Sequence, residues 1–368
     1  MTRLCVIHTE ASLGWGGQEI RVLTEMAGMT ARGHRLLLFC PAEARIFTEA
    51  RARGIEVEAL PIGKKRWSGL RGLRQRLKAL QPDLVVTHSS TDSWLTALAT
   101  RLWAAAPPAV RIRHISAPVG RTAATRWLYG RAAAHVVTTG ERLRSQLIRD
   151  LDLPESHVTS VPTGIDLAHY TPRDKAAARR ALGLQEAGFF VGIIATLRSW
   201  KGHRYLLDAW AGLPAGSDRL LVVGDGPGRA NLHRQAAELG IAERVVMPGN
   251  QDDVAPWLAA LDVFALPSYA NEGVPQAIMQ AMAMGLPVVS TPVGSIAEIV
   301  ADGETGLLVP PRDTDALRAG LARLAGDPAL CRRLGAAAAV RAGESFADGL
   351  MLDRMEAIFR QVLAGRHR

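Results

Sequence analysis

The sequence predicts an α/β fold made of two doubly wound, Rossmann-like domains. At 368 residues the chain exceeds the usual size of one domain, and 48% of its residues are apolar, which is enough for two hydrophobic cores. Short apolar runs alternate with helix-like segments almost throughout, a pattern typical of parallel sheets with helices on both faces. The alternation stops once, across the polar stretch 164–178, and then begins again. We therefore expect two domains facing a central cleft lined by strand carboxyl ends, where ligands bind.

The strands of each domain are predicted from their apolar runs. In the first half they lie at 4–9, 35–40, 57–62, 84–88, 110–116, 135–139 and 158–162. In the second half they lie at 189–195, 220–223, 245–248, 263–266, 287–290 and 307–309. We expect a first domain over 1–165, a linker over 164–178, a second domain over 166–345 and a last helix within 346–368. The apolar face of that helix consists of Leu350, Met355, Ile358, Phe359 and Val362.

Much of the net charge of +9 lies in one segment, residues 64–78, which has no acidic residue. Its basic residues are Lys64, Lys65, Arg66, Arg71, Arg74, Arg76 and Lys78, and its leucines, at 70, 73, 77 and 80, repeat at helical spacing beside Trp67. The pattern predicts a basic amphipathic helix, which either packs its leucines on its own sheet or docks on an anionic membrane surface. Zinc-finger spacing and aromatic ribonucleoprotein motifs are absent from the sequence, so we expect no nucleic-acid partner.

The sequence predicts a cytoplasmic protein, at most peripheral on the inner face of the cytoplasmic membrane. No apolar run approaches the roughly 18 residues that cross a bilayer, and no secretion signal precedes the first strand. Cys5, Cys40 and Cys331 lack metal-ligand spacing, so we expect buried free thiols.

The junction after the strand at 263–266 concentrates the candidate chemistry. Pro267 ends the strand, and Pro275 suits the first turn of a helix expected over 275–284. The amino end of this helix is a ready phosphate site, and Glu272 precedes it while Gln280 follows eight positions later. The alternative is a capped helix with a loop carboxylate in water.

Other polar residues and glycines follow predicted strands. Gly16 and Gly17 let backbone amides approach an anion or simply form a tight turn. Arg198 and Lys201, before Gly202, are two cations that either grip a phosphate or lie on the surface. His114 ends the strand at 110–116 and is either a site residue or a structural histidine.

A second group of residues has a weaker signal. His88 and Asp92 lie at a polar strand end suited to an acceptor's hydroxyls. The glycine-rich run 224–228 is similar to a dinucleotide fingerprint, but Arg229 replaces its last glycine, which favours a tight turn. The aspartate pairs at 150 and 152 and at 313 and 315 fit helix ends better than metal ligands, so we expect no metal and no cofactor.

These motifs together resemble the retaining nucleotide-sugar glycosyltransferases of family four. They occur in order along nearly the whole chain, as Gly16-Gly17, Pro162-Thr163-Gly164-Ile165-Asp166, Arg198-x-x-Lys201-Gly202, Gly224-Asp225-Gly226-Pro227 and Glu272-Gly273-x-Pro275. The resemblance implies the GT-B fold, no essential metal, an acceptor-side first domain, a donor-binding second domain and a last helix that returns to the first domain.

The resemblance also implies roles for individual residues. Glu272 would contact the donor sugar, Lys201 would hold the diphosphate, and His114 would lie near the sugar's primary hydroxyl. The donor-binding residues would be Gly16, Gly17, Gly273, Val274, Pro275 and Gln280. Two positions depart from the family pattern: Gln280 replaces a glutamate that binds the ribose, and Arg198 matches the family's arginine by proximity only.

The expected reaction is sugar transfer from a nucleoside diphosphate sugar to a glycan or lipid-linked acceptor of the cell envelope, as in lipopolysaccharide biosynthesis. Breaking the bond from sugar to diphosphate creates a leaving dianion, which Arg198, Lys201 and helix amides can stabilise without a metal. A sugar-nucleotide 2-epimerase and a non-catalytic sugar-nucleotide-binding protein are alternatives. A dehydrogenase is the weakest, because the glycine fingerprint is broken.

Overall fold

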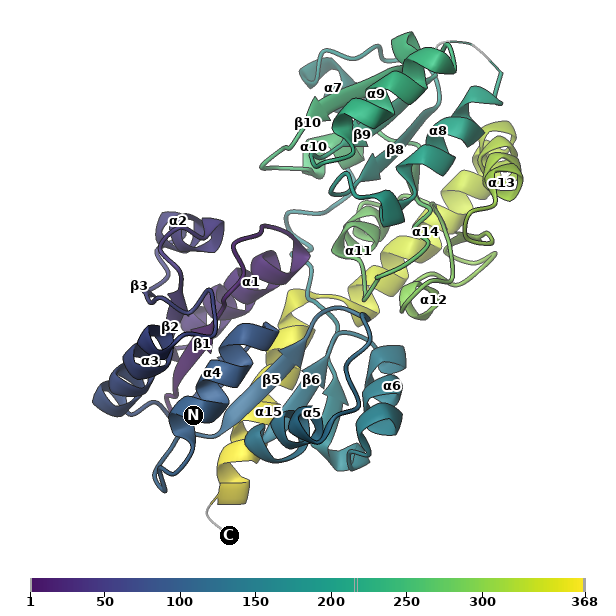
Figure 1. Ribbon diagram of the computed structural model, residues 1–368. Helices are drawn as coiled ribbons and strands as arrows, with labels where there is room; N and C mark the ends of the chain where they lie inside the picture. The colour runs from purple at the N-terminus through teal and green to yellow at the C-terminus, as the bar shows by residue number, and fades with distance from the viewer. Residues whose placement is uncertain (1, 215, 217, 367–368) are drawn as a thin grey trace. The chain divides into compact units, whose positions relative to one another are not determined.

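The computed structural model, which describes residues 2–214, 216 and 218–366, divides into two compact units (Figure 1). Unit 1 combines Met1–Gly164 with Asp348–Arg368, and unit 2 is Ile165–Ala347. The expected boundaries fall within two residues of these. The predicted linker over 164–178 is wrong, because all of it after Gly164 belongs to unit 2. There Ile165 N donates to Phe346 O at 2.7 Å, and helix α7 (Lys175–Ala181) begins inside the segment.

Unit 1 is built on a parallel sheet with the strand order β3-β2-β1-β4-β5-β6-β7. The strands are β1 (Cys5–Thr9), β2 (Arg35–Cys40), β3 (Val57–Ala59), β4 (Leu84–Thr87), β5 (Ala109–Arg113), β6 (His135–Thr138) and β7 (Val158–Ser160). Each lies where a strand was predicted, and β3 and β7 stop before the predicted ends, near Pro61 and Pro162. A proline has no N–H to donate to a strand ladder, which explains why the pairing ends early there.

The helices of unit 1 cover both faces of this sheet. They are α1 (Gly17–Ala31), α2 (Arg45–Ala52), α3 (Trp67–Leu80), α4 (Ser90–Thr100), α5 (Ala123–Trp127), a π-helical turn at Leu128–Ala132, α6 (Glu141–Leu151), a 3₁₀ turn at Glu155–His157 and α15 (Asp348–Arg366). The last helix, α15, packs on α1: Met355 and Phe359 share a buried apolar cluster with Val22 and Met26. The C-terminal segment thus completes the core of unit 1.

Unit 2 has a parallel sheet with the strand order β10-β9-β8-β11-β12-β13. Its strands are β8 (Phe190–Ile194), β9 (Arg219–Val223), β10 (Val245–Gly249), β11 (Val263–Leu266), β12 (Val288–Ser290) and β13 (Gly306–Leu308). Besides α7, its helices are α8 (His203–Ala211), α9 (Arg229–Glu238), α10 (Ala255–Ala259), α11 (Gln276–Ala283), α12 (Ile296–Ile299), α13 (Thr314–Gly326) and α14 (Pro328–Ser345), with 3₁₀ turns at Ser199–Lys201 and Ala242–Arg244. One apolar cluster, including Phe190, Trp210 and Phe264, forms its core.

The basic helix α3 uses its leucines inside unit 1. Leu73 and Leu77 are fully buried in an apolar cluster with Ile7 and Val85 of the sheet. The apolar stripe therefore packs on its own sheet and is not a membrane-inserting face. Trp67, at the start of the helix, remains 82% exposed.

No helix in the described part of the chain is long and apolar enough to cross a membrane. All three cysteines are free, but only Cys40 is buried, so the expectation of three buried thiols is wrong for the partly exposed Cys5 and Cys331.

Candidate active site

Lys201 and Glu272 form an ion pair at the carboxyl end of the unit 2 sheet. Lys201 Nζ lies 2.7 Å from Glu272 Oε1, and Ser268 Oγ donates to the same oxygen at 2.6 Å. The Glu272 side chain is 4% exposed and that of Lys201 is 19% exposed. A buried carboxylate needs such a partner, because an unpaired buried charge is strongly unfavourable. These two residues, which were predicted as candidates on separate loops, thus lie together in one site.

The two loops meet because β8 and β11 are neighbours in the sheet. Lys201 ends the 3₁₀ turn after β8, and Tyr269 N, after β11, donates to Trp200 O at 2.9 Å. Gly202 has φ of +81°, and a Cβ on it would lie 2.0 Å from Pro267 O. A side chain there would separate the loops, so this glycine allows the approach that pairs lysine and glutamate.

A second glycine holds the backbone of Glu272 from the other side. Gly294 has φ of +61°, and a Cβ on it would lie 2.1 Å from Glu272 O. Ser295 N donates to Gly273 O at 3.2 Å, and Thr291 Oγ1 donates to Ser268 O. The loop that carries Glu272 is therefore held by the segment that follows β12.

Helix α11 begins directly after this loop. Gly273, Val274 and Pro275 are buried in the approach to the helix, and Pro275 lies one position before its first residue, with φ of −68° and ψ of 118°. The predicted helix was longer by one residue at each end. Gln280 lies on α11 and is 9% exposed. The positive end of the helix dipole lies at this loop and favours an anion there.

Arg198 directly precedes the 3₁₀ turn that carries Lys201, and its side chain lies beside Trp200. It is exposed, and its guanidinium carbon is 5.7 Å from the ring centroid of Trp200. It lines a 600 Å³ cavity between α8 and α9 together with Trp200 and His203. Lys201 is not one of the residues that line this cavity.

The glycine-rich loop 224–228 packs against the β8–α8 loop. Leu197 N donates to Asp225 O at 3.0 Å. Gly224 has φ of +137°, and a Cβ on it would lie 2.1 Å from Ala195 O. The glycines serve this close contact between two backbones, in agreement with the tight-turn interpretation.

In unit 1, three histidine rings form a hydrogen-bonded chain across adjacent strands. His8 Nδ1 lies 3.0 Å from His88 Nε2, and His88 Nδ1 lies 3.1 Å from His114 Nε2. His8 and His88 are buried, and His114 is half-buried. Burial lowers the pKa of His8 to about 3. Burial also holds the pKa values of His88 and His114 well below the usual range, and the nearby Arg21 lowers them further, so all three rings are neutral near pH 7.

The structure gives His88 and Asp92 internal roles in place of the predicted contact with an acceptor. Both ring nitrogens of His88 are occupied by the neighbouring histidines. Asp92 is fully buried, and its carboxylate accepts from Thr9 Oγ1, His88 N and both N and Oγ of Ser89. It completes a capping box at the start of α4.

The loop before α1 is organised by Glu10. Gln18 Nε2 donates to Glu10 Oε2 at 2.5 Å, and Ser12 N donates to Oε1 at 2.9 Å. Burial and the neighbouring Asp92 raise the pKa of Glu10 to about 8. Gly16 precedes α1 with an extended backbone, φ −178°, and Gly17 begins the helix. The extended backbone would accept other residues, so what Gly16 contributes is the absence of a side chain.

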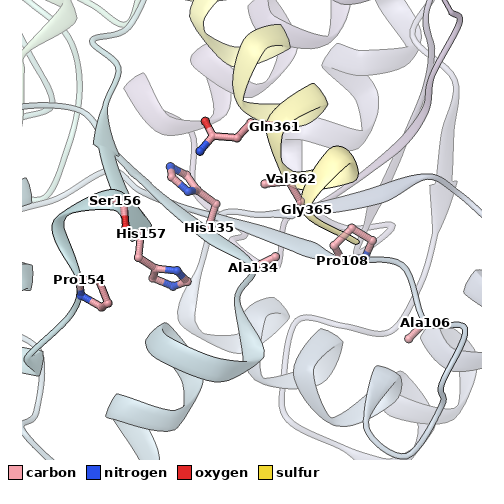
Figure 2. Close-up of a pocket in the computed structure, with 10 residues that line it drawn as sticks. All are labelled: Ala106, Pro108, Ala134, His135, Pro154, Ser156, His157, Gln361, Val362 and Gly365. Carbon is pink, nitrogen blue, oxygen red and sulfur yellow. The ribbon is translucent and has the colours of Figure 1, made fainter. Parts of the chain in front are cut away.

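Unit 1 also has a 510 Å³ cavity at the opposite edge of its sheet (Figure 2). Pro108, His135 and His157 lie at the amino ends of β5, β6 and β7, and Gln361 of α15 faces the same space. No predicted site residue lines this cavity. It is therefore separate from the site at the strand carboxyl ends.

Three site residues escaped the sequence reasoning: His8, Glu10 and Ser268. His8 and Glu10 had a detectable signal, because each is a polar residue at or within an apolar strand, where burial requires a partner. Ser268 had no detectable sequence signal, since serine is common after strands.

Comparison with known proteins matches both halves of the chain to glycosyltransferase families. Residues 15–169 match the family described as Glycosyltransferase Family 4, and residues 188–327 match Glycosyl transferases group 1. A solved structure of Anabaena Alr3699/HepE in complex with UDP-glucose superimposes with a TM-score of 0.87 at 24% identity, covering 98% of this chain and 100% of that one. The fold is therefore GT-B, with two Rossmann-like parallel-sheet domains.

The curated relatives of this chain are also named as glycosyltransferases. A D-inositol 3-phosphate glycosyltransferase of Nocardia farcinica is 33% identical over 314 residues, covering 76% of this chain and 68% of that protein. For other relatives of that name, the chain covers 46% to 62% of their length. A 2-deoxystreptamine glucosyltransferase of Streptomyces kanamyceticus is 28% identical over 350 residues, covering 85% of this chain and 89% of that protein. The chain is thus a glycosyltransferase and belongs to glycosyltransferase family 4.

Proposed function

We propose that this enzyme transfers a sugar from a nucleoside diphosphate sugar to a hydroxyl of a cell-envelope glycan or lipid-linked acceptor, with retention of the anomeric configuration and without an essential metal. The observation that carries the proposal is the Lys201–Glu272 pair beside the amino end of α11. A cation and a helix dipole there suit a diphosphate, and a fixed carboxylate suits the hydroxyls of the sugar attached to it.

The pair assigns a separate task to each residue. Lys201 and Ser268 both donate to Oε1 of Glu272, which leaves Oε2 as the acceptor for a hydroxyl of the donor sugar. The ammonium group has three donors, so Lys201 can keep this contact while it also binds the diphosphate. As the bond from sugar to phosphate breaks, the leaving oxygens gain negative charge and their contact with Lys201 strengthens.

Retention follows from attack on the leaving-group side. The acceptor hydroxyl would approach from the face that the diphosphate leaves, and a departing phosphate oxygen would take its proton. No protein nucleophile is then needed, and the developing charge is balanced by Lys201 and the α11 amides, with Arg198 contributing if its side chain turns from Trp200. UDP-glucose is the first donor to test, because the similar Alr3699/HepE structure contains it.

The acceptor class is proposed from the surface of unit 1. Lys64, Lys65, Arg66 and Trp67 are exposed at the start of α3, and a tryptophan beside cations is typical of contact with an anionic membrane surface. Such contact would bring the enzyme to a lipid-linked acceptor. A free cyclitol is the second candidate, because the names of the two curated relatives above contain inositol phosphate and deoxystreptamine, both hydroxylated six-membered rings.

A two-stage experiment tests the proposal. Thermal shifts with UDP, GDP, ADP and CMP sugars identify the donor, since a ligand at 100 times its Kd stabilises by about 2.7 kcal/mol. NMR of the product with lipid-linked glycan and cyclitol acceptors then gives the anomeric configuration and the acceptor. An inverted product refutes retention, and transfer to cyclitols alone refutes the envelope acceptor. Release of an altered sugar without acceptor would indicate epimerase activity, and stabilisation without turnover would indicate a binding function.

A further inference from the structure

Glu10 is a fully buried carboxyl group that directly follows β1 at the carboxyl edge of the unit 1 sheet. Among the described residues its side chain contacts two donors, Ser12 N at 2.9 Å and Gln18 Nε2 at 2.5 Å. Neither donor carries a positive charge. A buried carboxylate without a cationic partner is strongly unfavourable, and such a group binds a proton instead.

The ionisable groups around Glu10 do not supply the missing cation. Asp92 of α4 and Glu19 of α1 both interact with it electrostatically, and each disfavours its ionised form. Cys40 of β2 is a third neighbour, and its thiol is neutral because burial raises its pKa to about 12. All three groups are acids, so the surroundings of Glu10 favour a neutral carboxyl group.

Hydrogen bonds decide which acid of the Glu10 and Asp92 pair holds the proton. Burial raises the pKa of Asp92, but its four donors and the positive charge of Arg111 on β5 act in the opposite direction. Two of these donors are backbone N–H groups, which cannot accept a hydrogen bond from a protonated carboxyl group. Asp92 is therefore held in its ionised form, and the proton belongs on Glu10.

Gln18 is a suitable partner for a protonated Glu10. Its side chain is half-buried, and among the described residues it makes one hydrogen bond, the contact with Glu10 Oε2. A side-chain amide both donates and accepts, and its two orientations have nearly the same shape. With the amide turned, Gln18 Oε1 accepts from the Glu10 O–H and the contact is kept.

We propose that Glu10 is protonated in the folded protein at neutral pH and acts through Gln18 as a positioning residue for the segment 11–17, which contains Gly16 and Gly17. The O–H of Glu10 donates to Gln18, at the first turn of α1, while its other oxygen accepts from Ser12 N. One buried group thus fixes both ends of the segment. For donor binding the inference rests on the function proposed above, whereas the protonation of Glu10 does not depend on that function.

Ionisation of Glu10 would change the segment in two ways. The Gln18 amide would have to turn its N–H toward the carboxylate, and a negative charge would appear beside Asp92 and Glu19. The proposed donor carries a diphosphate, so a new negative charge beside Gly16 and Gly17 opposes its binding. Because the pKa of Glu10 is raised to about 8, first by burial and then by Asp92, donor binding should weaken as the pH rises through that value.

Infrared spectroscopy of the full-length protein detects the proton without any substrate. In the difference spectrum between the wild type and Glu10→Gln, we expect the C=O stretch of a protonated carboxyl group at about pH 6 and its loss by about pH 9.5. Bands from other carboxyl groups, including the buried Glu25, occur in both proteins and cancel. A carboxylate band alone at about pH 6 would overturn the inference, and so would a band that is lost in Asp92→Asn but kept in Glu10→Gln.

Urea unfolding gives an independent readout, because Glu10→Gln imitates the protonated carboxyl group and does not titrate. The unfolded chain releases the Glu10 proton near pH 4.5, but the folded chain keeps it to about pH 8. The free energy of unfolding of the wild type therefore falls as the pH rises through this window. We expect the unfolding constant of the wild type, divided by that of the variant, to rise about tenfold per pH unit between about pH 5 and 7.5.

Glu43→Gln, at an exposed position, is the control, and its unfolding constant should follow the wild type at every pH. A ratio of wild type to Glu10→Gln that stays constant with pH would show that Glu10 ionises equally in the folded and unfolded states. That result would overturn the inference.

Kinetics test the positioning role once a donor is known. We expect the donor KM of the wild type to rise severalfold between about pH 7 and 9, and that of Glu10→Gln to stay level. Glu10→Leu and Gln18→Leu should each raise KM at pH 7, and the double variant should raise it no further, because both changes break the same contact. A parallel rise of KM in Glu10→Gln, or additive leucine variants, would overturn the action through Gln18. If no sugar nucleotide is turned over, the proposed function fails, while infrared and unfolding data still decide the protonation.

Discussion

Lys201 Nζ lies 2.7 Å from Glu272 Oε1, although 71 positions separate the two residues in the chain. The contact joins the loops after two adjacent strands and places an ammonium group beside the start of α11. Under the proposed function this ion pair has two roles to separate, because it stabilises the fold and would also bind the substrate.

Removing the ammonium group should lower kcat far more than it raises the donor KM. Lys201→Ala should cost roughly 2 to 4 kcal/mol of barrier, because the contact strengthens as the diphosphate leaves. The same change also leaves a buried carboxylate without its cation and should lower Tm. The double variant Lys201→Ala/Glu272→Gln removes that unpaired charge and should recover Tm but not kcat. Recovery of both would make the pair purely structural.

The glycine behind Glu272 should be required for its position. Gly294→Ala and Gly303→Ala both place a side chain at positive φ, +61° and +74°, which costs roughly 1 to 2 kcal/mol. Of these two positions, only Gly294 would also have a clash of the new Cβ, at 2.1 Å from Glu272 O; at Gly303 the Cβ meets none of the described residues within 4 Å. We expect a clearly larger loss of stability, and loss of kcat, for Gly294→Ala alone. Equal effects in urea unfolding and in kinetics would contradict this account.

Restoring a carboxylate on α11 should tighten donor binding. Charged hydrogen bonds contribute about 1.5 to 3 kcal/mol and neutral ones about 0.5 to 1.5, so Gln280→Glu should gain near 1 kcal/mol from the ribose hydroxyls. The ribose is remote from the broken bond, so the gain should lower the donor KM severalfold at unchanged kcat. A higher KM would show that Gln280 is fitted to another contact.

The exposed cations before α3 should determine membrane association. Changing Lys64, Lys65 and Arg66 to glutamate should release the protein from anionic vesicles in cosedimentation, since each cation near such a surface contributes about 1 kcal/mol. The control variant changes Arg323, Arg332 and Arg333 to glutamate. These arginines are exposed in unit 2, so the control has the same net charge as the first variant. Wild-type protein that stays in the supernatant at low salt would refute membrane contact. Equal release of both variants would show that vesicle binding depends on the net charge of the protein and not on the cations before α3.

Acid should destabilise unit 2 partly through His203. Burial, with a smaller effect of Lys201, lowers the pKa of His203 to about 4. Between pH 6.5 and 4 the unfolded chain binds a proton that the folded chain does not, so the free energy of unfolding falls as the pH falls through this window. At pH 4.5 the loss should be on the order of 2 to 3 kcal/mol relative to pH 7.

His203→Asn should reduce this acid-dependent loss, because asparagine keeps an N–H near the Arg198 backbone and does not titrate. His233→Asn, at an exposed position, is the control and should follow the wild type. Urea unfolding at pH 7 and pH 4.5 measures both. If the free energy of unfolding has the same pH dependence in His203→Asn and the wild type, His203 binds its proton over the same pH range in the folded and unfolded states.

The sequence by itself determined the strands and the two-domain α/β class, and it singled out Lys201 and Glu272 as candidates on two separate loops. Strands buried on both faces read as continuous apolar runs, and loops that bind anions need glycines and cations, so both signals are local. Because interdomain linkers are identified only by polarity, the stretch 164–178 was misassigned. Its residues after Gly164 pack as part of unit 2.

Only the tertiary structure decided which polar residues meet. Strand order and register are properties of the whole sheet, so nothing near His8 in the sequence indicates its contacts with His88 and, through it, His114. The same holds for Asp92, which looked available to a ligand until its burial and four donors were known. The spacing of the leucines in α3 likewise is equally compatible with insertion into a membrane and with packing in a core. Packing against the sheet of unit 1 decided between the two.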